Sequence, residues 1–252
     1  MKKILLVNFL LLSISIQNIL AQPISIAAAA DLRFAMNELT KEFNKANPEI
    51  KIDVIYGSSG NLYQQIVNSA PYDVFFSADK SFPNKLDSLN LTESKPKLYA
   101  IGHLVLWSST LDLTKGIALL SDNGIKKIAI ANPAFAPYGK RAIECLKYYK
   151  LYDRILCKII KGENVSQTAH FVLTGNAEVG LIALSLALSP EMMSKGKYFI
   201  IDEKSYSKLE QAFVVIKKSQ INKDILKFVQ FIESEQARRI LDKFGFNPPL
   251  TK

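Results

Sequence analysis

Apolar stretches that fit strands alternate with stretches of helical apolar spacing along most of this sequence. An apolar run at 24–28 is followed by apolar residues that recur every three or four positions from Leu32 to Phe43. Strands that alternate with helices in this way predict an α/β fold with parallel sheets covered by helices. Further strand-like runs lie at 50–55, 73–76, 98–107, 128–131, 179–184 and 212–216, and further helix-like stretches lie at 141–149, 224–233 and 236–243 and after Leu62 and Val165.

The loops that follow the predicted strands carry small, polar or glycine residues. They lie at 29–31, 57–60, 77–79 and 137–139. In parallel sheets, ligands bind beyond the carboxyl ends of the strands, where such loops gather. The sequence therefore predicts one pocket built from several loops.

The loop at 57–60 has the chemistry of a small-anion site. Gly57 and Gly60 allow a tight turn, Ser58 and Ser59 supply hydroxyl groups, and a helix follows from Leu62. The start of a helix has free N–H groups and a partial positive charge, which together bind anions without a cation. An ordinary helix start with a glycine turn is the alternative interpretation.

The N-terminus predicts export. A basic start, Met1 to Lys3, precedes an apolar stretch at 4–16 and a small residue, Ala21. We interpret 1–21 as a secretory signal peptide, because the apolar stretch is too short to span a membrane. The mature chain would begin near Gln22 outside the cytoplasm.

Charge and cysteine content leave the ligand class open. The net charge is +9, but the lysines are scattered and no dense basic run predicts nucleic-acid binding. Cys145 and Cys157 could pair in an oxidising compartment or remain as small apolar residues, and the sequence does not decide.

The sequence argues against an enzyme. The histidines, His103 and His170, have no metal-ligand partner at helical spacing. Neither a Gly-x-Ser-x-Gly elbow nor a phosphate-binding P-loop occurs. A secreted hydrolase or transferase that uses a carboxylate pair, Asp31 and Asp79, is retained as an alternative.

Seven segments, at 27–32, 56–62, 70–79, 131–133, 136–139, 162–165 and 244–246, keep an order and spacing that resemble those of one family. Over 23–246 the chain resembles the periplasmic molybdate-binding proteins of ABC importers. The resemblance implies a two-lobed periplasmic-binding-protein fold, each lobe a mostly parallel sheet flanked by helices, with the ligand cleft between the lobes. Lobe I would comprise 22–102 and 212–252, and lobe II 103–211.

The resemblance also implies a function. A protein of this family binds molybdate or tungstate as an oxyanion and delivers it to an inner-membrane ABC permease with its ATPase. It would act in the periplasm as a monomer, without a cofactor and without a metal cation of its own.

Seven residues are carried over as the binding site: Ala30, Asp31, Ser58, Ser59, Ala78, Tyr138 and Val165. Ser59 would donate its hydroxyl and N–H, and Ser58 would replace it if the register shifts by one. Ala78 and Val165 would offer backbone N–H groups, and Tyr138 its phenol.

Two positions depart from the family pattern. Asp31 stands where relatives often have Ser or Asn, and a carboxylate beside a dianion would be repelled. We expect its side chain to turn away and cap the helix from Leu32, while the N–H of Ala30 or Asp31 faces the ligand. Ala183 stands where many relatives carry a ligand-contacting tyrosine, and Tyr138 would take over that role.

With neutral donors, the choice among anions would depend on the size of the cavity and on whether the anion carries a proton. The alternative interpretation is therefore the same fold adapted to sulfate, phosphate or an organic acid. An organic acid would favour an arginine in the pocket. Arg33 could reach the rim, and we expect Lys140 and Arg141 to face outward.

Overall fold

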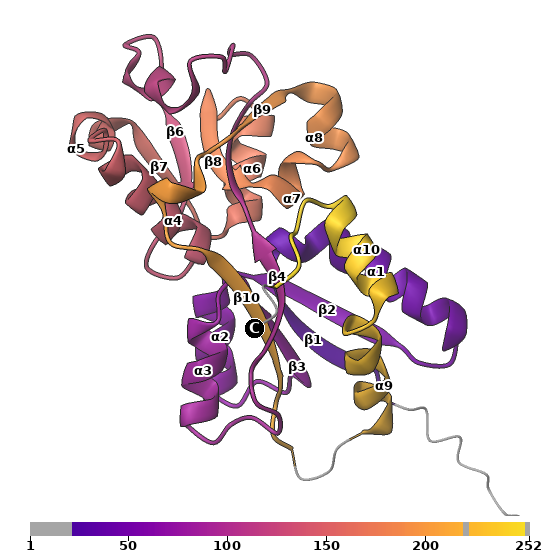
Figure 1. Ribbon diagram of the computed structural model, residues 1–252. Coiled ribbons are helices and arrows are strands. Elements are labelled where there is room, and N and C mark those ends of the chain that lie inside the picture. Colours follow the sequence, from indigo (N-terminus) through magenta and orange to yellow (C-terminus); the bar gives the residue numbers. More distant parts are fainter. Residues whose placement is uncertain (1–21, 219–221, 250–252) are drawn as a thin grey trace, which may run out of the picture.

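The first lobe is built on a five-stranded sheet with the strand order β2-β1-β3-β10-β4 (Figure 1). The computed structural model describes residues 22–218 and 222–249, so the predicted signal peptide lies outside the described part. Strands β1, β2 and β3 run parallel, and β10 runs antiparallel to both β3 and β4. The strands are β1 (Ile24–Ala29), β2 (Ile52–Gly57), β3 (Val74–Ser77), β4 (Lys97–Gly102) and β10 (Leu209–Val215).

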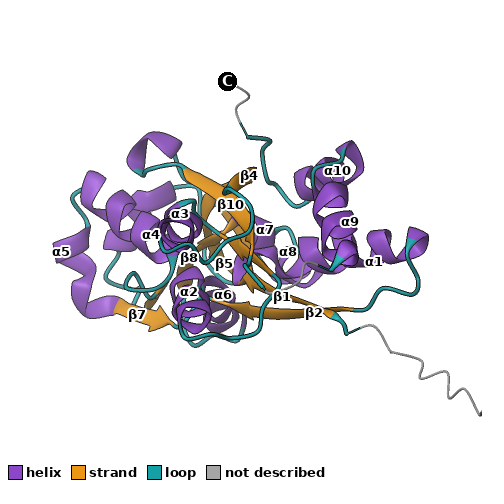
Figure 2. Ribbon diagram, turned by 90° about the horizontal axis from the view of Figure 1, so that it is seen from below, coloured by secondary structure: helices purple, strands orange, loops and turns teal. Residues whose placement is uncertain are grey.

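Helices cover both faces of this sheet because its strands are apolar on both faces. Figure 2 shows α1, α9 and α10 on one side and α2 and α3 on the other. Alternate residues of β1 follow this division: Ile26 packs in the cluster with α1, α9 and α10, whereas Ala27 packs in the cluster with α2 and α3. The helices are α1 (Arg33–Ala46), α2 (Ser59–Val67), α3 (Ser81–Ser88), α9 (Lys223–Ile232) and α10 (Glu235–Lys243), and the 3-10 turn η1 (Ala30–Leu32) leads into α1.

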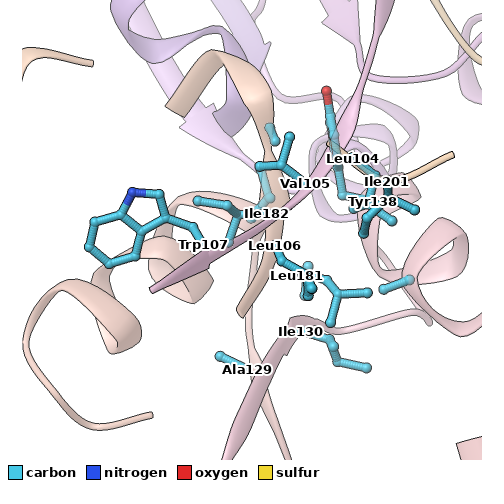
Figure 3. Close-up of a cluster of buried hydrophobic side chains, with 14 of the residues drawn as sticks. Leu104, Val105, Leu106, Trp107, Ala129, Ile130, Tyr138, Leu181, Ile182 and Ile201 are labelled. Atoms are coloured by element: carbon cyan, nitrogen blue, oxygen red, sulfur yellow. The ribbon is translucent and has the colours of Figure 1, made fainter. Parts of the chain in front are cut away.

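The second lobe repeats this plan with the strand order β7-β6-β8-β5-β9. Its core is formed by fully buried apolar side chains, among them Leu106, Trp107 and Ile130 (Figure 3). The strands are β5 (Leu104–Ser108), β6 (Ile128–Ala131), β7 (Ile159–Gly162), β8 (Val179–Ala183) and β9 (Lys197–Ile200). The helices are α4 (Pro137–Tyr148), α5 (Tyr152–Ile155), α6 (Val165–Leu173), α7 (Leu184–Ala187) and α8 (Pro190–Lys195), with 3-10 turns η2 (Gly116–Ser121), η3 (Leu156–Lys158) and η4 (Glu203–Ser205).

The predicted fold class is confirmed. In each sheet a single strand, β10 or β5, runs against the other four. The chain passes from the first sheet to the second at His103, between β4 and β5, and returns between β9 and β10. Among the described residues, no helix is both long and apolar enough to cross a membrane.

Several element boundaries differ from the sequence prediction. The apolar run at 98–107 is divided at His103 into strands of two different sheets, which periodicity alone could not show. Strand β10 begins at Leu209 instead of Ala212, and β2 spans Ile52–Gly57 instead of 50–55. Helices α2 and α4 begin three and four residues earlier than predicted, at Ser59 and Pro137. In α4 the reason is chemical, because proline is favoured in the first helical position.

Candidate functional site

A small cavity lies between the lobes, beyond the carboxyl ends of strands from both sheets. It holds no more than about 190 Å³ of space between its lining atoms, which suits a small ion better than a drug-sized molecule. All seven carried-over residues line it: Ala30, Asp31, Ser58, Ser59, Ala78, Tyr138 and Val165. The other lining residues are Ala29, Gly57, Ala136, Pro137 and Asn164. The structure therefore brings the candidate residues together, while their role in binding stays a prediction.

Helix starts surround this cavity. Ala30, Ser59, Pro137 and Val165, the first residues of η1, α2, α4 and α6, all line it. The first N–H groups of a helix have no partner within the helix and carry partial positive charge, and in α4, where Pro137 has no N–H, they belong to the residues that follow it. No lysine or arginine is among the residues that line the cavity. Among the lining residues, the partial positive charges therefore come from backbone dipoles and not from side-chain cations.

Two buried serines bring hydroxyl groups to the cavity. Ser59 Oγ accepts a hydrogen bond from the backbone N–H of Ala78 at 3.0 Å. Its own proton is not used in that bond and remains available for donation. Ser58 Oγ is buried without a partner among the described residues. Both hydroxyls can thus donate to an anion, while the Ala78 N–H already has an acceptor in this conformation.

The second lobe contributes the start of α6. Asn164 caps this helix, because its Oδ1 accepts a hydrogen bond from Gln167 N at 3.0 Å. The cap leaves the N–H of Val165, in the first turn, to other acceptors. Asn164 was not predicted, although an asparagine directly before a helical stretch is a recognisable capping signal.

Asp31 does not cap a helix, which corrects the sequence prediction. Neither η1 nor α1 has a side-chain capping bond, because Leu32 already has helical backbone angles whereas a capping residue needs an extended backbone. Instead Asp31 is fully buried, and its Oδ2 accepts a hydrogen bond of 2.6 Å from Gln211 Nε2. Its Oδ1 has no hydrogen-bond partner within the described part of the chain.

Gln211 connects this carboxyl group to two tyrosines. Its Nε2 lies 3.4 Å from the Tyr138 hydroxyl, and its Oε1 accepts a hydrogen bond from the Tyr99 hydroxyl. A Cβ atom on Gly102 would lie 2.4 Å from the Tyr138 hydroxyl, so only glycine leaves room for this network. Sequence reasoning missed Gln211, although a polar residue within an apolar strand signals a buried hydrogen-bond partner.

Burial controls the protonation of these groups. It raises the pKa of Asp31 to about 6, against the opposing effects of the hydrogen bond from Gln211 and of the nearby Tyr138 hydroxyl and the backbone N–H groups of Asp31 and Leu32. Burial and, secondly, the charge of Asp31 raise the pKa of Tyr138 well above its usual range. Tyr138 is therefore a neutral phenol that can donate a hydrogen bond at physiological pH.

Other candidate residues lie elsewhere. Asp79 does not line the cavity, and its Oδ1 accepts hydrogen bonds from Ser81 N and Oγ at 3.0 and 2.7 Å, so the structure does not bring Asp31 and Asp79 together there. Ala183, at the end of β8, is buried and does not line the cavity.

Arg33, considered for the rim, and Lys140 and Arg141, expected to face outward, all have other partners, and Arg141 is largely buried. Arg33 lies over the Tyr56 ring, Lys140 over the Phe82 ring, and Arg141 pairs with Glu144. The described residues contain no cluster of three His, Cys, Asp or Glu side chains that could hold a metal ion.

The cysteines are free thiols. Cys145 is buried and Cys157 is exposed. Burial raises the pKa of the Cys145 thiol to about 11, so it is not a reactive thiolate at neutral pH.

The two lobes touch across the cavity. Gly60 N, at the start of α2, donates a hydrogen bond of 2.8 Å to Phe135 O of the second lobe. Asn61 Nδ2 donates to Glu163 Oε1 at 3.2 Å. A Cβ atom on Gly60 would lie 2.7 Å from Phe135 O, so the lobes approach each other as closely as glycine allows. These contacts describe a closed arrangement of the lobes.

Comparison with known proteins supports the two-lobed fold. Residues 24–247 match the family described as "Bacterial extracellular solute-binding protein". The molybdate-binding protein ModA of Azotobacter vinelandii is 31% identical over 228 residues, which cover 90% of this chain and 90% of ModA. ModA of Rhodobacter capsulatus is 33% identical over 194 residues, which cover 76% and 75%.

A solved structure matches as well. The periplasmic molybdate-binding protein of Azotobacter vinelandii superposes with a TM-score of 0.83 at 31% identity, covering 90% of this chain and 99% of that one. Since the family match spans nearly the whole described chain, the protein belongs to the bacterial extracellular solute-binding proteins.

Proposed function

We propose that this protein binds molybdate and tungstate outside the cytoplasm and delivers them to an ABC permease for import. The observation that carries the proposal is the small cavity formed by helix starts and serine hydroxyls between the lobes, with no cation among its lining residues. The curated relatives named as molybdate-binding proteins support this choice of ligand.

Neutral donors suit a dianion that must be bound and released. Preorganised N–H and O–H groups replace the hydration shell of the ion without a salt bridge. In the proposed site Ser59 and Ser58 donate their hydroxyls, Tyr138 donates its phenol, and Val165 donates its backbone N–H. Ala30 and Ala78 add backbone N–H groups, and the Ala78 N–H would exchange its bond to Ser59 for one to the ion.

Selectivity follows from size and protonation. Molybdate is a larger tetrahedron than sulfate, so a cavity shaped for it leaves sulfate with stretched hydrogen bonds. Phosphate carries a proton near neutral pH, and the backbone N–H donors of the site cannot accept it.

The remaining features follow from the same proposal. The protein is exported through a signal peptide at 1–21, acts in the periplasm as a monomer, and is not an enzyme. Its lobes are 22–102 with 212–252, and 103–211. The passage of the chain between the sheets at His103 supports the first boundary, while β10, which pairs in the first sheet, begins at Leu209, three residues before the proposed second boundary.

A thermal-shift titration of the mature chain tests the ligand. A ligand that binds only the folded protein raises the melting temperature in a concentration-dependent manner. We expect molybdate and tungstate to raise it and sulfate and phosphate to have little effect. A flat response to molybdate and tungstate would contradict the proposal.

Calorimetry of a serine variant tests the site. Ser59→Ala removes a donor to a charged acceptor, so affinity should fall by about 10- to 100-fold. Ser88→Ala is the matched control, because Ser88 lies on α3 and its Oγ bonds to Asn84 O outside the cavity. Equal affinity of the two variants would show that the site is wrongly placed.

A further inference from the structure

We propose that Asp31 takes up one proton when the oxyanion binds, and that its Oδ1 then donates a hydrogen bond to the ion. This inference rests on the proposed function and specifies the protonation state of the binding site. It turns the residue that conflicts with a dianion into a donor.

The geometry assigns different roles to the two oxygens of Asp31. Oδ2 accepts the 2.6 Å hydrogen bond from Gln211 Nε2, as a carbonyl oxygen of a neutral acid also can. Oδ1 is buried in a residue that lines the cavity and has no partner among the described residues. A buried polar atom without a partner is costly. A proton on Oδ1 would satisfy that atom by donating to an ion in the cavity.

No compensating charge stabilises the ionised form of Asp31. The titratable groups that face it are the phenols of Tyr138, from α4, and Tyr99, from β4. Gln211, from β10, is neutral, and Ser185, from α7, donates to the backbone oxygen of Asp31 and not to its carboxyl group. Helices α1 and α6 also pack against η1: Arg33, which begins α1, lies over the Tyr56 ring, and His170, the titratable residue of α6, is exposed. No cation contributes to the pKa of Asp31, and only neutral donors, Gln211, the Tyr138 hydroxyl and the N–H groups of Asp31 and Leu32, favour its ionised form.

A dianion in the cavity makes the ionised form of Asp31 still less favourable. Burial already raises the pKa of Asp31 to about 6 without a ligand. Two like charges in a low-dielectric site repel strongly, so a bound dianion raises this pKa further. At pH 7 the free site is mostly ionised and the occupied site mostly protonated. Binding therefore takes up close to one proton from solvent.

Linkage gives the expected pH dependence. Below about pH 6 the free site is already protonated, so affinity changes little with pH. Above about pH 6 each binding event must take up a proton, so affinity falls by about tenfold per pH unit until the occupied site also ionises.

Calorimetry in several buffers measures the proton directly. Molybdate would be titrated into the mature protein at pH 7 in buffers of different ionisation enthalpy, such as Pipes and Tris. The slope of the binding heat against buffer enthalpy gives the number of protons taken up. We expect a value near 0.9, as a pKa of about 6 in the free site implies. A value near zero, with molybdate bound, overturns the inference and leaves the proposed function intact.

An Asp31→Asn variant identifies the group. An asparagine offers an oxygen to Gln211 and an N–H to the ion without titrating. Binding should take up no proton, and affinity should be independent of pH between 6 and 8.5. At pH 8 the variant should bind up to about 100-fold more tightly than the wild-type protein.

Asp73→Asn is the matched control. Asp73 is a buried carboxylate just before β3, at the opposite end of that strand from Ala78, and it bonds to Ser25 N and Lys218. Its replacement should leave the proton uptake unchanged. Loss of uptake in this control as well would contradict the assignment to Asp31.

Titration with phosphate tests the opposite case, in which Asp31 stays ionised when the anion binds. An ionised Asp31 would accept a hydrogen bond from a protonated oxyanion. Tighter binding of phosphate than of molybdate, without proton uptake, would show that Asp31 stays ionised and would overturn the inference. Absence of heat with molybdate and tungstate at pH 6 and at pH 8 would instead overturn the proposed function and the inference together.

Discussion

The two lobes have the same strand plan but equip the cavity differently. In each, three parallel strands are followed by an antiparallel strand and a fifth strand at the edge. The loops of the first lobe bring a carboxyl group and two hydroxyls, from Asp31, Ser58 and Ser59. The second lobe brings mainly backbone, with Tyr138 as its polar side chain beside Asn164. One scaffold thus places helix starts, while the side chains on them give each lobe its own chemistry.

A glycine near the start of a helix in each lobe shows a further difference between the lobes. Gly60 and Gly139 both lie in the first turn of a helix that follows a parallel strand. A Cβ atom on Gly139 would lie 2.2 Å from Ala131 O of its own lobe, whereas one on Gly60 would lie 2.7 Å from Phe135 O of the other lobe. Equivalent glycines therefore serve stability within a lobe in one case and contact between lobes in the other.

The largest effect on stability is expected for Gly139→Ala. The added methyl group collides with backbone that cannot move without disturbing β6, so the free energy of unfolding should fall by about 3 kcal/mol. Urea unfolding measures it. A loss below about 1 kcal/mol would show that α4 can shift away from β6.

A pH effect of similar size is expected from Asp31. Its folded pKa, about 6, lies above its ordinary value of 3.8, so the folded state holds the proton more tightly. The resulting stability is fully present below about pH 3.8 and is lost as pH rises through about 6, a change of about 3 kcal/mol. Urea unfolding of ligand-free wild-type protein and Asp31→Asn at pH 4 and pH 7 measures this difference. Parallel pH profiles of the two proteins would contradict it.

A smaller effect, on affinity, is expected for Gly60→Ala. The methyl group prevents the approach to Phe135 O, so the lobes should close incompletely and molybdate affinity should fall by about tenfold or more. The free energy of unfolding should change by less than about 1 kcal/mol, because an open arrangement relieves the collision. Calorimetry with a parallel urea unfolding separates the two effects. A loss of stability as large as that of Gly139→Ala would show that Gly60, like Gly139, serves packing within its own lobe, and would contradict the difference drawn between the two glycines.

The smallest effect is expected for Asn61→Ala. Its side chain makes an exposed 3.2 Å hydrogen bond to Glu163 across the lobes. Because an exposed bond of this kind contributes little, molybdate affinity should fall by less than about fivefold. A loss as large as that of Gly60→Ala would mean that side-chain contacts, and not backbone approach, hold the lobes closed.

Periodicity predicted the strands and helices because alternating and helical apolar spacing reflect which faces are buried. It could not divide 98–107 between two sheets, since the apolar run continues through both parts, although β4 is less buried than β5. Proline at position 137 did mark the true start of α4, and a reading that weighed it as a first helical residue would have placed the helix correctly.

The cavity was predictable to the level of loops, because small and polar residues after strands gather at one edge of a sheet. The hydrogen bonds within it were not. Ser59 bonds to Ala78, which lies 19 residues away, and Asp31 bonds to Gln211, which lies 180 residues away. Both pairs depend on packing within the first lobe, and a single sequence does not show which partners meet, even where a polar residue in an apolar strand, such as Gln211, indicates a buried hydrogen bond.

The position of β10 constrains the order in which the protein can fold. This strand lies between β3 and β4 in the first sheet, yet it follows the whole second lobe in the sequence. The five strands of the second sheet, by contrast, form an unbroken segment from Leu104 to Ile200. In a chain that emerges N-terminus first, β4 waits without its partner until β10 arrives, while the later segment already has all its strands. The lobe that begins the sequence is therefore the one that completes last.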